Sequence, residues 1–221
     1  MSASRIIDLR KLLAERFPQE QLPPADRLST GLEIFDQNLA GGLAKGAITE
    51  LSSARPNAGS ASIIAALLQR ACRDRSFLAL IDGRDSFDPA SLGASALHHL
   101  LWVRCHTARE SLQAADLLLR DGNFPLVIVD LVLNPLLDLQ KIPASHWYRL
   151  QRLVEPVPTA FLVFTPRSMI SSAQWKLQLE NRWTLPQLDW DAADLRKRFR
   201  VRLQRAQPNK WRSDLKLAHA S

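Results

Sequence analysis

The chain has 221 residues, a formal net charge of +7 and a hydrophobic content of 46%, with 13 prolines and 8 glycines. This length accommodates one well-filled core and does not require a second domain. The composition excludes collagen-like and low-complexity chains, and no apolar run approaches the length of a membrane-spanning helix. The N-terminus, MSASRIIDLRKLL, lacks the apolar stretch of a signal peptide, so we expect a cytoplasmic protein with no membrane partner.

The first predicted element is an amphipathic helix over residues 5–17, in which charged residues separate an apolar stripe. The stripe consists of Ile6, Leu9, Leu13 and Phe17. Pro23, Pro24 and their polar neighbours indicate a linker, so residues 1–25 are expected to form a separate unit. Two interpretations remain: the stripe docks on a partner protein, or the helix folds back on its own domain.

From residue 47 onwards, short apolar segments alternate with helical patterns, which predicts a parallel sheet with helices on both faces. The predicted strands are 47–52, 77–82, 100–105, 125–130 and 159–164. The predicted helices are 62–75, 90–99, 107–122 and 145–156. We therefore expect an α/β core over residues 26–185.

Near the C-terminus, residues 175–180 and 199–204 alternate between apolar and polar side chains. This pattern is typical of half-exposed strands, which we expect to run antiparallel at the edge of the sheet. Residues 186–221 are predicted to form a basic C-terminal strand and tail.

Most of the excess positive charge lies in this last segment, which makes a nucleic acid the first candidate partner. The candidate DNA-binding residues are Arg196, Arg198, Arg200, Arg202, Arg205 and Lys210, with Trp211 available to stack on a base. In the alternative interpretation, the arginines are solvated side chains that protect an edge strand from aggregation.

The two cysteines, Cys72 and Cys105, lie in apolar segments and have no metal-ligand spacing. The histidines do not form a zinc motif either. We expect structural thiols, no metal site and no cofactor.

Three segments at suitable separation resemble the RecA recombinase family: residues 26–51, 79–89 and 125–130. The matching residues of the first segment are Ser29, Thr30, Gly31, Asp36, Gly41, Gly42, Leu43, Gly46 and Glu50. The second resembles the strand that carries the family's catalytic glutamate, and the third resembles its Walker B strand. The resemblance implies a RecA-like fold with a nucleotide loop after residue 52.

That loop departs from the pattern GxxxxGK[ST], in which backbone N–H groups and a lysine hold the phosphates. Ser53 replaces the first glycine, Pro56 removes one N–H group, and Gly59 or Ser60 stands in the place of the lysine. We interpret the loop as a vestigial phosphate loop. In the alternative interpretation, Arg55, Ser60, Ser62 and the N-terminus of a helix over residues 60–74 still bind phosphate.

The hydrolytic residues of the family are also incomplete. Arg84 stands where the family carries a glutamate, and arginine cannot act as a base at neutral pH. Thr165 and Pro166 occupy the place of the nucleotide-sensing glutamine. Only the Walker B-like Asp130 remains, either as a Mg²⁺ ligand or as a cap of the following turn. We expect a pseudo-ATPase and no catalytic residues.

A RecA-like chain of this size, with a degenerate loop, an N-terminal helix and an arginine-rich last strand, is similar to the ImuA family. This similarity implies an accessory role in the bacterial DNA-damage (SOS) response and translesion mutagenesis. The implied partners are RecA, an ImuB-like Y-family polymerase homologue and a DnaE2-type polymerase. A divergent RecA-family ATPase and a SulA-like cell-division regulator are the alternatives, and homo-oligomerisation remains open.

Overall fold

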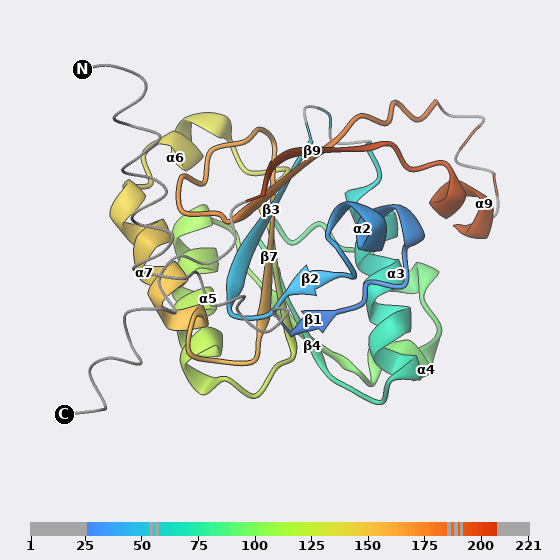
Figure 1. Ribbon diagram of the computed structural model, residues 1–221, viewed down its shortest axis with the longest axis horizontal. Coiled ribbons are helices and arrows are strands. Elements are labelled where there is room, and N and C mark those ends of the chain that lie inside the picture. The colour runs from blue at the N-terminus through green and yellow to red at the C-terminus, as the bar shows by residue number, and fades with distance from the viewer. Residues whose placement is uncertain are drawn as a thin grey trace, which may run out of the picture.

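The computed structural model describes residues 26–53, 55, 58–184, 187, 190 and 192–206. Its central feature is a seven-stranded sheet in the order β5-β4-β6-β7-β3-β8-β9, which helices flank on both sides (Figure 1). In chain order these strands are β3 (Ala47–Ser53), β4 (Leu78–Asp82), β5 (Leu100–Arg104), β6 (Leu126–Asp130), β7 (Ala160–Thr165), β8 (Trp175–Leu179) and β9 (Val201–Ala206). The predicted α/β class is confirmed.

The helices fall into two layers. In Figure 1, α2, α3 and α4 lie on one side of the sheet and α5, α6 and α7 on the other. Their bounds are α2 (Glu33–Asn38), α3 (Ser60–Arg73), α4 (Ala94–Leu97), α5 (Ala108–Asp121), α6 (Leu136–Gln140), α7 (Ala144–Val154) and α9 (Ala192–Lys197), with a 3₁₀ turn η1 at Pro89–Ser91. A small ribbon of β1 (Arg27–Leu28) and β2 (Leu43–Ala44) precedes β3. The predicted helix over 90–99 is therefore shorter than expected, since Pro89 and Gly93 begin separate turns.

The five predicted core strands are confirmed. Burial explains the apolar runs of β3, β4, β6 and β7, whereas β5 lies at the edge of the sheet and is only partly buried. Neighbouring residues of β4 serve two cores: Leu80 packs into the cluster beneath α3, whereas Ala79 and Ile81 pack into the cluster beneath α5 and α7. All three are fully buried. A parallel strand covered on both faces has no polar face, which is why its sequence does not alternate.

The prediction for the two C-terminal strands is half right. β9 runs antiparallel to β8, as expected, but β8 runs parallel to β3, so the antiparallel prediction for β8 is wrong. Alternation of apolar and polar residues reports that one face of a strand is exposed, and it carries no information about strand direction. Phe199, just before β9, is buried and joins the core cluster on the α3 side.

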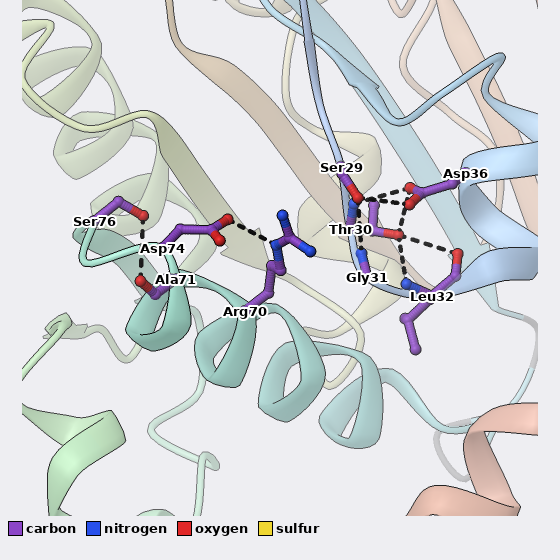
Figure 2. Close-up of polar contacts among 9 residues, drawn as sticks. All are labelled: Ser29, Thr30, Gly31, Leu32, Asp36, Arg70, Ala71, Asp74 and Ser76. Carbon is purple, nitrogen blue, oxygen red and sulfur yellow. Dashed lines mark hydrogen bonds and ion pairs between the residues drawn. The ribbon is translucent and has the colours of Figure 1, made fainter.

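The segment before α2 shows why several residues of 26–51 are needed structurally. The Asp36 carboxylate accepts hydrogen bonds from Ser29 Oγ (2.8 Å), Thr30 N (2.8 Å) and Thr30 Oγ1 (2.7 Å), as Figure 2 shows. Gly42 has φ +131°, and a Cβ there would lie 2.3 Å from the Leu28 carbonyl oxygen, so only glycine fits. These residues shape the approach to β3 through contacts within the chain.

Candidate functional site at the carboxyl edge of the sheet

The candidate phosphate loop leaves the carboxyl end of β3 and enters α3. Ser53 is buried, and its hydroxyl donates to the Arg55 carbonyl oxygen at 2.5 Å. Gly59 is the N-cap of α3 in the left-handed conformation, and Ser60 begins the helix, close to the predicted start at Ser62. Pro56 and its neighbours Ala54 and Asn57 lie outside the described residues. The Ser53 hydroxyl is therefore used in a hydrogen bond within the loop itself.

Two aromatic rings cover Gly59. A Cβ on Gly59 would lie 2.6 Å from Phe199 Cε1 and 3.0 Å from Trp183 Nε1. The Trp183 indole donates to the Ala58 carbonyl oxygen at 3.1 Å, and the two rings meet edge to face with centroids 6.1 Å apart. Phe199 also contacts Phe35 of α2 edge to face. This side of the loop is filled by the chain's own side chains, an arrangement that we call the aromatic plug.

The start of α3 offers little for a ligand beyond its backbone. Ser60 is buried and Ser62 is half-buried, and neither side chain caps the helix. Arg55 is exposed. Of the residues predicted to bind phosphate, only Arg55 is exposed. The aromatic plug covers Gly59, which lies between Arg55 and Ser60 in the chain.

The second part of the edge holds two carboxylates, because β4 and β6 pair in register with Asp82 opposite Asp130. Asp82 is buried and accepts hydrogen bonds from the backbone N–H groups of Arg84, Ser86 and Phe87, which fixes the turn after β4. Its oxygens are therefore used within this turn.

Asp130 accepts a hydrogen bond from the Val132 backbone N–H at 3.0 Å, so it caps the turn after β6 as the structural interpretation expected. Burial raises the pKa of Asp130 to about 6, and the neighbouring Asp82 also raises it, against the lowering effect of the Val132 N–H. Arg84, at the expected glutamate position, is exposed and donates to the His106 carbonyl oxygen.

Glu50 in β3 is a charged residue that the sequence analysis matched to the first RecA-like segment without assigning it a role. It is fully buried and forms an ion pair with Lys176 of β8 at 3.0 Å. It also accepts hydrogen bonds from Thr165 Oγ1, Ser168 Oγ, Met169 N and Ile170 N. A single carboxylate thereby ties the segment after β7 to the centre of the sheet.

The five described arginines of the basic segment do not share one role. Arg196 donates to Gln69 of α3, Arg205 donates to the Ser171 carbonyl oxygen, and Arg202 pairs with Glu180 at 3.0 Å. The Arg198 guanidinium lies over the Trp190 ring, 4.3 Å from its centroid, and Arg200 is exposed. Lys210, Trp211 and the predicted docking stripe Ile6, Leu9, Leu13 and Phe17 lie outside the described residues.

Among the described residues, no three His, Cys, Asp or Glu side chains form a group that could hold a metal ion. Cys105 is buried and Cys72 is half-buried, and burial raises the pKa of the Cys105 thiol. In the same part of the chain, no helix has both the length and the apolar character to cross a membrane.

Fold and site together define an α/β protein whose mostly parallel sheet carries a glycine-capped helix and two carboxylates at one edge. A comparison with models of known protein families gives no match, and a comparison with curated proteins gives no significant match.

Proposed function

We propose that the chain is a non-catalytic accessory protein with a RecA-like core, which acts in the bacterial DNA-damage response and in translesion mutagenesis. It works through contacts with RecA and with a polymerase complex that contains an ImuB-like homologue and a DnaE2-type polymerase. The resemblance of residues 26–51, 79–89 and 125–130 to RecA recombinases supports this proposal. The segments containing β3, β4 and β6 reach the same edge of the sheet, where a nucleotide site is expected in α/β proteins.

The aromatic plug is the observation that carries the non-catalytic part of the proposal. A phosphate loop must leave room beside its backbone for the phosphates, and here Phe199 and Trp183 fill the space next to Gly59. Asp82 is used by the turn after β4, and Arg84 cannot act as a base, which also supports a chain without hydrolytic activity. The proposed protein therefore does not hydrolyse ATP.

The test is a calorimetric titration of Mg-ATP into the purified full chain, followed by a phosphate-release assay on the same sample. We expect no binding heat above dilution and no phosphate above a blank without protein. Micromolar binding, with turnover abolished by Asp130→Ala, would contradict the proposal and favour the divergent ATPase instead.

The partner part of the proposal needs its own experiment. We expect the immobilised chain to retain purified RecA and the ImuB-like homologue, and deletion of residues 1–22 to abolish the association with RecA. Equal retention of RecA by the truncated chain would remove the predicted helix from the interface. Retention of neither protein by the full chain would contradict the proposed partners.

A further inference from the structure

One face of the antiparallel pair β8–β9 is polar and exposed. Leu177, Leu179 and Val201 turn toward the core on the α3 side, so the alternate residues project from the opposite face. On that face Gln178 Oε1 accepts hydrogen bonds from Arg202 Nη2 (2.8 Å) and Gln204 Nε2 (2.7 Å). The Arg202 side chain is 63% exposed, so the face is open to solvent.

A depression of about 250 Å³ continues this face beyond the carboxyl end of β8. It is lined by Arg55, Gln178, Leu179, Glu180, Asn181 and Arg182. Arg200 borders it, because its carbonyl oxygen accepts from Glu180 N and its own N–H donates to Asn181 Oδ1. Arg55, Arg182, Arg200 and Arg202, together with Gln178 and Gln204, form what we call the basic face.

The basic face has a surplus of positive charge. Glu180 is its acidic residue, and Arg202 already pairs with it. The guanidinium groups of Arg55, Arg182 and Arg200 have no hydrogen bond or ion pair to any described residue, and all three side chains are exposed. Exposed arginines are fully charged at neutral pH, and their planar forks match the oxygens of a phosphate.

The geometry of the basic face selects the kind of phosphate ligand. Arg200 and Arg202 are two residues apart near one strand, so their α-carbons are about 6.7 Å apart, a separation similar to that between successive phosphates of an extended nucleic acid strand. In the described part of the chain, the face is a sheet surface without a projecting helix or ribbon of the kind that enters a duplex groove. Gln178 and Gln204 supply amide groups beside Arg202.

We propose that the basic face binds the sugar–phosphate backbone of a single-stranded nucleic acid. This site replaces the predicted DNA-binding set in part: it adds Arg55 and Arg182 and leaves out Arg196, Arg198 and Arg205, which contact other parts of the protein. It extends the proposed function, and its test depends neither on ATP nor on a protein partner.

The experiment measures fluorescence anisotropy of a labelled oligothymidylate of about 20 nucleotides, which exceeds the usual site size of one binding surface. The full chain is compared with the double variant Arg182→Gln/Arg200→Gln and with a matched control, Arg109→Gln/Arg152→Gln. The control removes two exposed arginines of α5 and α7, whose guanidinium groups also have no hydrogen bond or ion pair within the described part of the chain. Thermal melting of both variants checks that the fold is retained.

We expect the double variant to bind about tenfold more weakly and to reduce the slope of log affinity against log salt by about 1.4, since each single-strand phosphate contact contributes about 0.7. The control should bind like the wild type. Arg55→Gln alone should weaken binding in the same direction.

Equal weakening of the control would overturn the proposal, because it would show attraction by net charge alone. Wild-type affinity in the double variant, or no binding by the wild type, would also overturn it. Tighter binding of polyglutamate than of oligothymidylate would reassign the basic face to an acidic protein. Since the assay contains no ATP, RecA or polymerase, its failure is distinct from failure of the proposed function.

Discussion

The two halves of the carboxyl edge use their charged residues in opposite ways. Around β3 and β8, Glu50 has an ion-pair partner and four hydrogen-bond donors, and the aromatic plug covers Gly59 in the loop after β3. Around β4 and β6, Asp130 has one backbone donor and a pKa raised to about 6. A buried carboxylate stabilises a fold only where enough donors replace the lost water.

This difference separates two kinds of motif residue. Glu50 occupies a position of the segment that resembles RecA recombinases. It also has a structural role, since it links β3 to β7 through Thr165 and to β8 through Lys176. Asp130 also occupies a position of that pattern, but it is only partly buried and its single backbone donor does not offset the loss of water that raises its pKa. A match to a family motif therefore does not by itself show whether a carboxylate stabilises the fold through its own contacts.

The largest effect is expected from Glu50→Ala. This variant leaves the mostly buried Lys176 ammonium unpaired and releases the segment after β7, so the free energy of unfolding should fall by about 3–5 kcal/mol. Urea denaturation measures the change. Asp138→Ala removes a carboxylate paired with Lys141 on the surface and should cost less than about 1 kcal/mol. Equal losses in the two variants would show that burial does not set the value of the Glu50 pair.

The aromatic plug is tested by three glycine-to-alanine variants. Gly59→Ala combines positive φ with a clash against Phe199 and should cost about 2–4 kcal/mol. Gly41→Ala has positive φ in open space and isolates the backbone strain, about 1 kcal/mol. Gly93→Ala has neither feature and should change stability by less than about 0.5 kcal/mol. If Gly59→Ala costs no more than Gly41→Ala, the rings do not press on the loop.

The other half of the edge is tested by the pH dependence of Asp130→Asn. The folded-state pKa of Asp130, about 6, lies above the value of 3.8 for an unperturbed carboxyl, so ionisation costs stability as pH rises and the cost levels off above the folded pKa. Asparagine keeps an acceptor for the Val132 N–H and does not titrate. Relative to the wild type, the variant should gain about 1–1.5 kcal/mol between about pH 5 and pH 8. Parallel stability curves would contradict the raised pKa.

The smallest effect concerns the hydrogen bond that holds the plug in place. Trp183→Phe keeps a ring near Gly59 but removes the donor to the Ala58 carbonyl oxygen. The matched variant is Trp102→Phe, since the Trp102 Nε1 atom is buried and has no hydrogen-bond partner among the described residues. We expect Trp183→Phe to lose about 1 kcal/mol more than Trp102→Phe in thermal or urea unfolding. The reverse order would mean that the indole bond does not stabilise the loop.

The sequence by itself determined the local features. Contiguous apolar runs predicted the buried parallel strands, and helical periodicity predicted α3, α5 and α7 to within a few residues of their ends. The start of α5 is an example: Thr107 accepts from Glu110 N while the Glu110 carboxylate accepts from His106 N, which is a capping arrangement set by near neighbours. Such signals depend on residues close in the chain, so periodicity and spacing reveal them.

Only the tertiary structure decided the direction of β8, the position of Phe199 and the role of Glu50. Alternation in 175–180 is the same for either strand direction, and the contact of Phe199 with Gly59 joins segments that are far apart in sequence. The donors to Glu50 come from β7, the segment after it and β8, so their convergence depends on strand order. Sequence spacing determines which residues can neighbour one another along an element, whereas sheet order determines which distant groups share a buried space and therefore which charges are compensated.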